Sequence, residues 1–371
     1  MDVNYGSSEP FTLGVEEELQ LVNAESFELT SRYAEVFGEA ARSDERIKAE
    51  LLQSTVEVAT KPARTVGEAI AESGELRRRA HSEAEASGVA VISAGTHPFS
   101  RYEHQDVTEE QRYADLVEAL QWAVARQLIF GLHVHVGLES AQQAIAVANG
   151  LRTWLPELLA ASANSPFWHG RDSGLGSTRS TVFDTMPRSG IPPAFASFEE
   201  FELLVDRGVR TGSWDDYTFI WWDLRPHPRL GTIEIRICDA QTRLENTAVL
   251  VALVQSLVAT LAERYEREGT LPIQPRPLIE ENKWRAARFG LEATLVDLER
   301  DEERPARQAL RALADLAGPA AKRLGCAHEL GLLEALLDRG DGAHEQRVAH
   351  EAAGGSLLGV AQWLAERTID S

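Results

Sequence analysis

Thr232-Ile233-Glu234-Ile235-Arg236-Ile237-Cys238 alternates aliphatic side chains with other types at every second position. Side chains alternate between the two faces of a β-strand, so this segment predicts a strand with its isoleucines on one face and Thr, Glu, Arg and Cys on the other. Three further segments place charged or imidazole groups on one face in the same way: Leu13–Leu21, Leu132–Val136 and Trp221–Arg225. A sheet normally exposes its polar face to water. Carboxylates, imidazoles and arginines on several strands indicate instead a face that binds metal and a polyanion.

The order of the predicted elements favours an α+β fold. Strands are expected near 12–22, 48–60, 89–94, 130–138, 218–225 and 231–238, with helices near 62–87, 108–128 and 140–162 between them. Thr108 and Gln111 fit a capping box at the start of the second helix. Hairpins and unequal insertions favour a mainly antiparallel sheet of about six strands. We expect a single domain over 1–371, strand-rich over about 10–240 and helical over about 244–371.

Composition restricts the classes of partner. A net charge of −21 over 371 residues argues against nucleic acid, because binding to phosphates needs an excess of Lys and Arg. The sequence contains no run of the roughly 20 apolar residues that a membrane span needs, and its first residues lack the pattern of a signal peptide. We therefore expect a cytoplasmic protein. Cys238 and Cys326 form neither a disulfide framework nor a zinc pattern, and a packed thiol is the expectation for Cys238.

The carboxylates of two segments point to a cation site. Glu16 and Glu18 share a strand face, where they repel one another unless a cation lies between them. Mg²⁺ prefers oxygen ligands and retains substrate phosphates. Glu57 shares its parity with Gln53, whereas Glu50 needs a bulge or bend to reach the same site. The alternative is a solvated run of glutamates on charged edge strands.

Two pairs of residues carry the catalytic hypotheses. His133 and His135 on one strand face are typical of a zinc hydrolase; alternatively, His133 completes a carboxylate Mg²⁺ site and His135 faces phosphate or substrate. Glu234 and Arg236 lie one pleat apart, as phosphoryl transfer requires, with the carboxylate for metal and the guanidinium for phosphate. A cross-strand salt bridge is the alternative interpretation of this pair.

Four ordered segments resemble the signatures of the type 2 glutamate–cysteine ligases, also called ATP-dependent carboxylate–amine ligases. They are Phe11-Thr12-Leu13-Gly14-Val15-Glu16-Glu17-Glu18, Gly95-Thr96-His97-Pro98-Phe99, Gly131-Leu132-His133-Val134-His135-Val136-Gly137 and Gly231-Thr232-Ile233-Glu234-Ile235-Arg236. The resemblance extends from about residue 9 to about 365. It implies a curved antiparallel sheet like that of glutamine synthetase, with helices on the convex side and with ATP and two or three Mg²⁺ ions on the concave face. Mn²⁺ is an alternative ion.

The resemblance also implies a reaction and a set of site residues. The γ-phosphoryl group of ATP passes to a glutamate-like carboxylate, and an amine, L-cysteine being one candidate, attacks the acyl phosphate to give an amide. A homodimer is expected. Arg236 and His135 are the predicted catalytic residues, and Arg179 and Arg225 the predicted substrate-binding residues. The neutral amide of Gln53 is expected to weaken one metal site. The predicted metal ligands are Glu16, Glu18, Glu57, His133 and Glu234, with Glu50 added.

Overall fold

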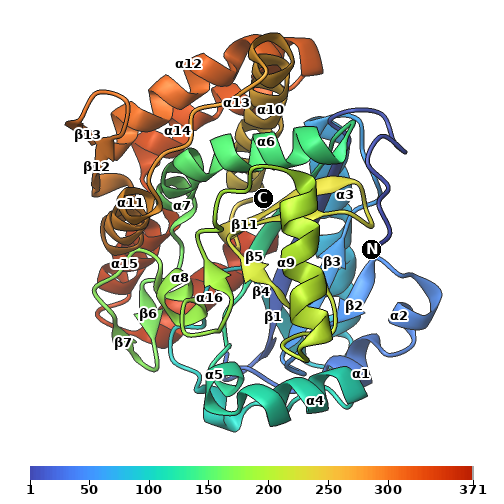
Figure 1. The fold of residues 1–371 in the computed structure, drawn as a ribbon. Coiled ribbons are helices and arrows are strands. Elements are labelled where there is room, and N and C mark those ends of the chain that lie inside the picture. Colours follow the sequence, from blue (N-terminus) through green and yellow to red (C-terminus); the bar gives the residue numbers. More distant parts are fainter. Residues whose placement is uncertain (370–371) are drawn as a thin grey trace.

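An antiparallel sheet of seven strands lies at the centre of the computed structural model, which describes residues 1–369 apart from the side chain of Arg42 (Figure 1). Six strands follow the order β10-β11-β5-β1-β3-β2, and β4 pairs with the end of β1. The predicted α+β fold with a mainly antiparallel sheet is therefore confirmed. The strands are β1 (Leu13–Asn23), β2 (Ile47–Ala49), β3 (Thr55–Ala59), β4 (Val89–Ile92), β5 (Gly131–Gly137), β10 (Leu224–His227) and β11 (Thr232–Asp239).

Four helices pack against the aliphatic face of this sheet. They are α3 (Val66–Glu85), α6 (Ala141–Leu151), α7 (Leu155–Ser162) and α10 (Leu244–Glu268). Val134 and Ile235 are fully buried in one core cluster with Leu253 of α10. By length and composition α10 could cross a membrane, yet 83% of its most apolar stretch is buried inside the protein, as in the core helix of a soluble protein.

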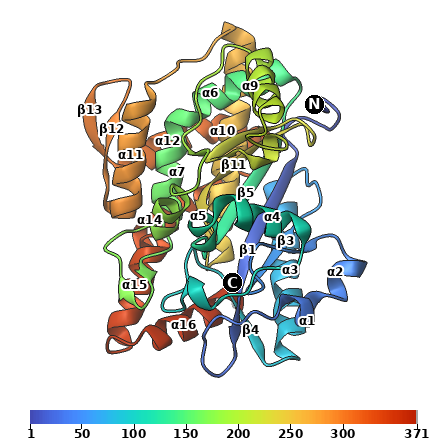
Figure 2. The same ribbon diagram turned by 60° about the horizontal axis from the view of Figure 1, so that its bottom comes forward.

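The remaining elements surround this core. The chain after α10 forms helices interrupted by one hairpin (Figures 1 and 2): α11 (Arg276–Phe289), β12 (Thr294–Asp297), β13 (Glu302–Pro305), α12 (Ala306–Leu324), α13 (Ala327–Gly331), α14 (Leu333–Arg339), α15 (Gly342–Ala352) and α16 (Leu357–Ile369). Shorter elements elsewhere in the chain include α1 (Tyr33–Phe37), α4 (Gln111–Leu120), α5 (Trp122–Ala125), α8 (Thr178–Phe183), β8 (Ser189–Gly190) and β9 (Trp221–Trp222).

Two local expectations are wrong. Residues 48–60 form two strands joined by a turn, and the predicted helix over 108–128 is split at Gln121, whose φ of 50° is outside the helical region. Thr108 does not cap a helix either, because α4 begins at Gln111 after Glu110. The Thr108 hydroxyl instead donates to the carbonyl oxygen of Glu50 at 2.5 Å. This bond fixes the turn after β2.

A β-bulge changes the face of Cys238. Ile235 pairs with Val134, but Cys238 pairs with Leu132, so β11 contains one more residue than β5 between these two pairs. The extra residue moves Cys238 from the polar face, where strict alternation predicts it, to the aliphatic face. There its thiol is packed in the core, and burial raises its pKa to about 12.

One carboxylate of β1 lies on the helix-covered face. Glu17 is fully buried, and its two oxygens accept from Arg77 of α3 at 2.6 and 2.9 Å. Thr247 of α10 donates to the same carboxylate at 3.1 Å. Arg77 also donates to the carbonyl oxygens of Gln241 and Thr242. This network ties β1 to α3 and to the start of α10.

We expect Arg77→Ala to lower the free energy of unfolding by about 3–5 kcal/mol, because it leaves the Glu17 carboxylate buried and uncompensated. The double variant Glu17→Leu/Arg77→Leu should recover most of this loss, since no charge then remains to be desolvated. Urea unfolding measures both. A cost of less than about 1 kcal/mol for the single variant would show that this network does not support the fold.

Candidate active site

A cavity of about 390 Å³ opens on the polar face of the sheet. Its walls come from the strands β1, β2, β3, β5, β10 and β11 and from α4, α5 and α8. Figure 2 shows α4 and α5 in front of β1 and β5, on the side opposite α10. All ten residues that the sequence predicts for the site line this cavity: Glu16, Glu18, Glu50, Glu57, His133, His135, Arg179, Arg225, Glu234 and Arg236.

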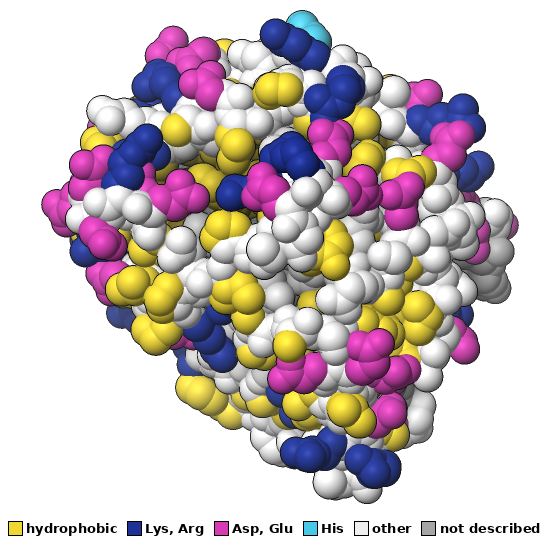
Figure 3. Space-filling model, turned by 45° about the horizontal axis from the view of Figure 1, so that its top comes forward, with side chains coloured by type: hydrophobic (Ala, Val, Ile, Leu, Met, Phe, Trp, Pro, Cys, Tyr) yellow, Lys and Arg dark blue, Asp and Glu magenta, His cyan; other side chains and the backbone are white. Residues whose placement is uncertain are grey.

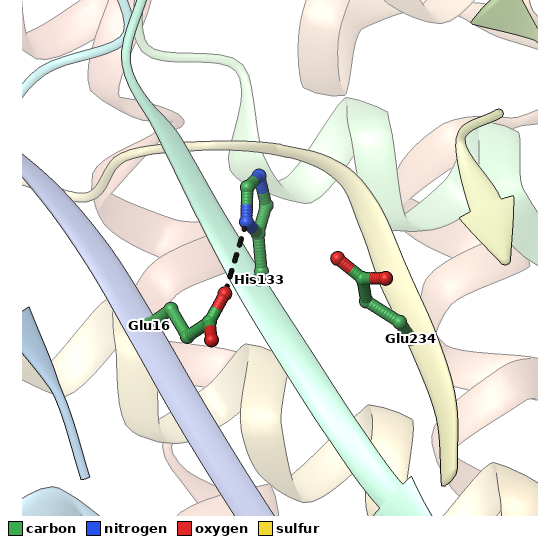
Figure 4. A group of neighbouring side chains, drawn as sticks. All are labelled: Glu16, His133 and Glu234. Carbon is green, nitrogen blue, oxygen red and sulfur yellow. Dashed lines mark ion pairs between the residues drawn. The ribbon is translucent and has the colours of Figure 1, made fainter. Parts of the chain in front are cut away.

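The first acidic cluster consists of Glu16, His133 and Glu234, on the three adjacent strands β1, β5 and β11 (Figure 4). One ligand atom from each lies within 4.8 Å of the others. Glu16 pairs directly with His133 in the strand register, and its Oε2 lies 3.5 Å from His133 Nδ1. Strand pairing therefore brings these groups together.

His135 contacts the same cluster. Its Nε2 lies 3.8 Å from Glu16 Oε2 and 3.9 Å from Glu234 Oε1, while Thr232 Oγ1 is 3.0 Å from Nδ1. Burial disfavours the charged ring, but the hydrogen bond to Glu16 and the charge of Glu234 outweigh it, and the pKa of His135 is raised. His133 differs: burial and the nearby Arg236 lower its pKa.

The second acidic cluster consists of Glu18, Glu50 and Glu57, whose carboxylate oxygens also lie within 4.8 Å of one another. Glu18 and Glu57 are paired across β1 and β3. Glu50 reaches them because it follows β2, where it shares its parity with Lys48, and the turn before β3 supplies the bend that the sequence requires. The bond from Thr108 to its carbonyl oxygen holds it there.

Lys48 is a site residue that sequence reasoning missed. Its Nζ lies 3.0 Å from Glu57 Oε1 and 3.8 Å from Glu16 Oε1, so it bridges the two clusters. In a single strand over 48–60, Lys48 and Glu57 would lie on opposite faces. Recognition of the turn between β2 and β3 is the signal that would have placed Lys48 correctly.

The second cluster is chemically suited to a hard cation. Among the described residues, the only ion pair formed by its three carboxylates is that of Glu57 with Lys48. Burial and the charge of Glu18 raise the pKa of Glu50 to about 7, and burial with the charges of Glu16 and Glu50 raises the pKa of Glu57 well above its ordinary value. These shifts reflect unbalanced negative charge, and oxygen ligands of this kind fit Mg²⁺.

Two arginines hold Glu234. Arg225 Nε donates to Glu234 Oε2 at 2.7 Å, and Arg236 Nη1 donates to Oε1. Burial opposes ionisation of this carboxyl, yet Arg225 and Arg236 lower its pKa well below the ordinary value. Arg225 Nη1 also donates to the carbonyl oxygens of Thr218 and Ile220, so this predicted substrate-binding residue has protein partners for Nε and Nη1.

Arg179 supports the bulge in β11. It extends from α8 and donates to the carbonyl oxygens of Ile237 at 3.2 Å and of Arg236 at 3.1 Å. A side chain at Gly131 would collide with this guanidinium and would come within 2.9 Å of His133 Nε2, so the close approach requires glycine. Arg179 lines the cavity, its contacts hold the backbone of Arg236 and Ile237, and substrate binding by this residue stays a prediction.

Gln53 does not belong to either cluster. Its amide oxygen accepts from the backbone N–H of Ala34 in α1 at 3.0 Å. The expectation that Gln53 weakens a metal site is therefore wrong, because the turn before β3 directs this residue away from Glu57. Arg112 and Trp221 line the cavity and were not predicted.

Comparisons with known proteins agree with this geometry. The model of glutamate-cysteine ligase family 2 matches residues 12–361. A predicted glutamate–cysteine ligase 2-1 of Rubrobacter xylanophilus is 45% identical over 96% of this chain and 95% of its own length. A predicted glutamate–cysteine ligase 2 of Sorangium cellulosum is 43% identical over 91% of this chain and 90% of its own.

The fold is also similar to a solved structure. The glutamate–cysteine ligase of Francisella tularensis in complex with AMP has a TM-score of 0.68 at 12% identity, covering 100% of this chain and 91% of that one. The protein is an ATP-dependent ligase, and the hydrolase alternative finds no support. The chain belongs to glutamate–cysteine ligase family 2.

We expect the two arginines on Glu234 to separate stability from activity. Arg225→Ala should lower the free energy of unfolding by about 3–5 kcal/mol, because it breaks a buried ion pair. Arg236→Ala should cost less, since Arg225 still holds Glu234, but should slow ADP release about 100-fold or more. Urea unfolding and ADP release measure the two effects. If Arg236→Ala lost stability and kept its activity, the pair would be only a salt bridge.

Proposed function

We propose that this ligase joins a glutamate-like carboxylate to an amine in a reaction that depends on ATP and Mg²⁺. The observation that supports this most is the placement of two acidic clusters beside two guanidinium groups in one cavity. Phosphoryl transfer between anions needs this combination, because negative charge must be neutralised on both sides of the transferred group.

The two clusters divide the metal ligands into two sets. Glu16, His133 and Glu234 would hold one ion, and Glu18, Glu50 and Glu57 another. Mg²⁺ held by these residues would supply positive charge that offsets the charge of the phosphates. The ammonium group of Lys48 neutralises part of the same acidic surface.

Arg236 would stabilise the charge of the transferred phosphoryl group. Its side chain lines the cavity, and its Nε has no hydrogen-bond partner within the described residues, although it is buried. Glu234 orients Nη1, and Arg179 fixes the backbone of the bulge. His135 presents Nε2 between two carboxylates of the first cluster, where it would contact the phosphates or the substrate.

The bonds change in two steps. A carboxylate oxygen of the first substrate attacks the γ-phosphorus of ATP, and the bond to ADP breaks. The amine nitrogen then attacks the acyl carbon, phosphate leaves with the bonding electrons, and the nitrogen loses a proton. The names of the relatives support glutamate as the carboxylate and L-cysteine as one candidate amine.

The proposal also covers the partners, the location and the oligomeric state of the protein. The acidic net charge of −21 supports small-molecule substrates and no nucleic-acid partner. The burial of α10 supports a protein of the cytoplasm without a membrane partner. We also propose a homodimer, which sedimentation of the purified protein would test.

Purified protein with ATP, Mg²⁺ and L-glutamate should release ADP only when the correct amine is present. We would test about twenty amines singly, L-cysteine among them, with Glu234→Gln as the inactive reference and Glu25→Gln, an exposed turn residue, as the matched control. Amine-dependent release that Glu25→Gln retains and Glu234→Gln loses supports the ligase. Absence of ADP release with every amine would contradict the choice of substrates.

A further inference from the structure

A second cavity, of about 330 Å³, lies in the helical layer of the protein. Its walls come from α7, α10 and α12 and from the hairpin of β12 and β13, and within the described chain it shares no lining residue with the catalytic cavity. Figure 3 views the protein from the side of α10 and α12 and shows hydrophobic side chains recessed between charged ones. The apolar walls are Trp154, Leu261, Pro272, Leu295, Leu298 and Leu316.

Glu157 of α7 lines this cavity and is only 7% exposed. Its Oε2 is buried and has no hydrogen-bond partner within residues 1–369. The cations of the cavity wall are already paired. Arg304 lies 2.5 Å and Arg300 3.3 Å from Asp297, and Arg264 lies 2.9 Å from Glu268. The wall therefore offers an unpaired carboxylate oxygen and, within the described residues, no unpaired arginine to match it.

Burying a carboxylate without a partner costs free energy. The surroundings of Glu157 therefore indicate which kind of partner is missing. Burial raises the pKa of Glu157 to about 7, which shows how poorly its charge is compensated. One water molecule could satisfy an oxygen, but it would occupy only about 30 Å³ and would leave the apolar walls unfilled.

Other classes of ligand fit less well. A hard metal ion needs about six oxygen ligands. Within the described residues the other carboxylates of the wall are the half-buried Asp297, which is paired with two arginines, and the exposed Glu299. An anion would be repelled by Glu157. A cation with an apolar body satisfies both features, because the charge meets the carboxylate and the body fills the space between the leucines and Trp154.

We propose that this cavity is a second ligand site, which binds a small organic ammonium compound through Glu157. The site is separate from the proposed reaction, because the catalytic cavity lies on the other face of the sheet. Trp154 and the leucines select for an apolar body, and the ammonium group donates to the carboxylate.

Benzylamine and its neutral analogue benzyl alcohol test this site by calorimetric titration of the full-length protein at pH 8. The wild-type protein should bind benzylamine at least tenfold more tightly than benzyl alcohol. Glu157→Gln, which preserves shape and removes the charge, should weaken benzylamine binding at least tenfold. The matched control Glu299→Gln removes an exposed carboxylate at the cavity wall and should leave binding unchanged.

Three results would overturn the proposal: no binding of benzylamine, equal binding of the two compounds, or equal benzylamine binding by wild type and Glu157→Gln. The last result would show that the Glu157 carboxylate does not hold the amine. A thermal melt of Glu157→Gln without ligand controls for misfolding. If that variant does not fold, Glu157→Asp, which shortens the carboxylate by one methylene, should weaken benzylamine binding and leave that of benzyl alcohol unchanged.

Discussion

Side chains alternate between the two faces of each antiparallel strand, and the rest of this structure depends on that constraint. One face of the sheet is aliphatic and buried by α3, α6, α7 and α10, so the other face must carry the remaining side chains of the same strands. On β1, β3, β5 and β11 these side chains include carboxylates, imidazoles and an arginine. The packing of the core therefore fixes the relative positions of the charged groups that line the cavity.

The balance of charge differs between the two acidic clusters. In the first cluster Glu234 is compensated by Arg225 and Arg236, and its pKa is lowered. In the second cluster Lys48 contacts Glu57 alone, and the pKa values of Glu50 and Glu57 are raised. The second cluster is thus the part of the cavity with the less compensated negative charge, while Glu234 of the first cluster already pairs with two guanidinium groups.

The features that could be predicted from the sequence are those that depend only on the alternation of side chains along the strands. Parity placed Glu16, Glu18 and Glu234 on one face, and the structure brings them into one cavity. It could not reveal the bulge that moves Cys238 into the core, because strict alternation carries no signal for an inserted residue. Parity also puts Glu17 on the helix-covered face, but it could not identify the partner of this carboxylate, because Arg77 lies 60 residues away.

Turns explain the other differences between the predicted and the observed structure. Lys48 enters the cavity and Gln53 leaves it because β2 and β3 are separated by a turn that breaks the parity of residues 48–60. Thr108, whose spacing to Gln111 suggested a helix cap, instead bonds to the backbone of that turn. Local pattern cannot identify such long-range contacts, which depend on tertiary packing.

The proposed binding of Mg²⁺ by the second acidic cluster is tested most directly by calorimetric titration of the nucleotide-free protein with MgCl₂. We predict that Glu57→Gln weakens Mg²⁺ binding about tenfold or more, because it removes a charged oxygen ligand. The exposed Glu25→Gln should leave binding unchanged. Equal Mg²⁺ affinity in wild type and Glu57→Gln would contradict the assignment of this cluster as a metal site.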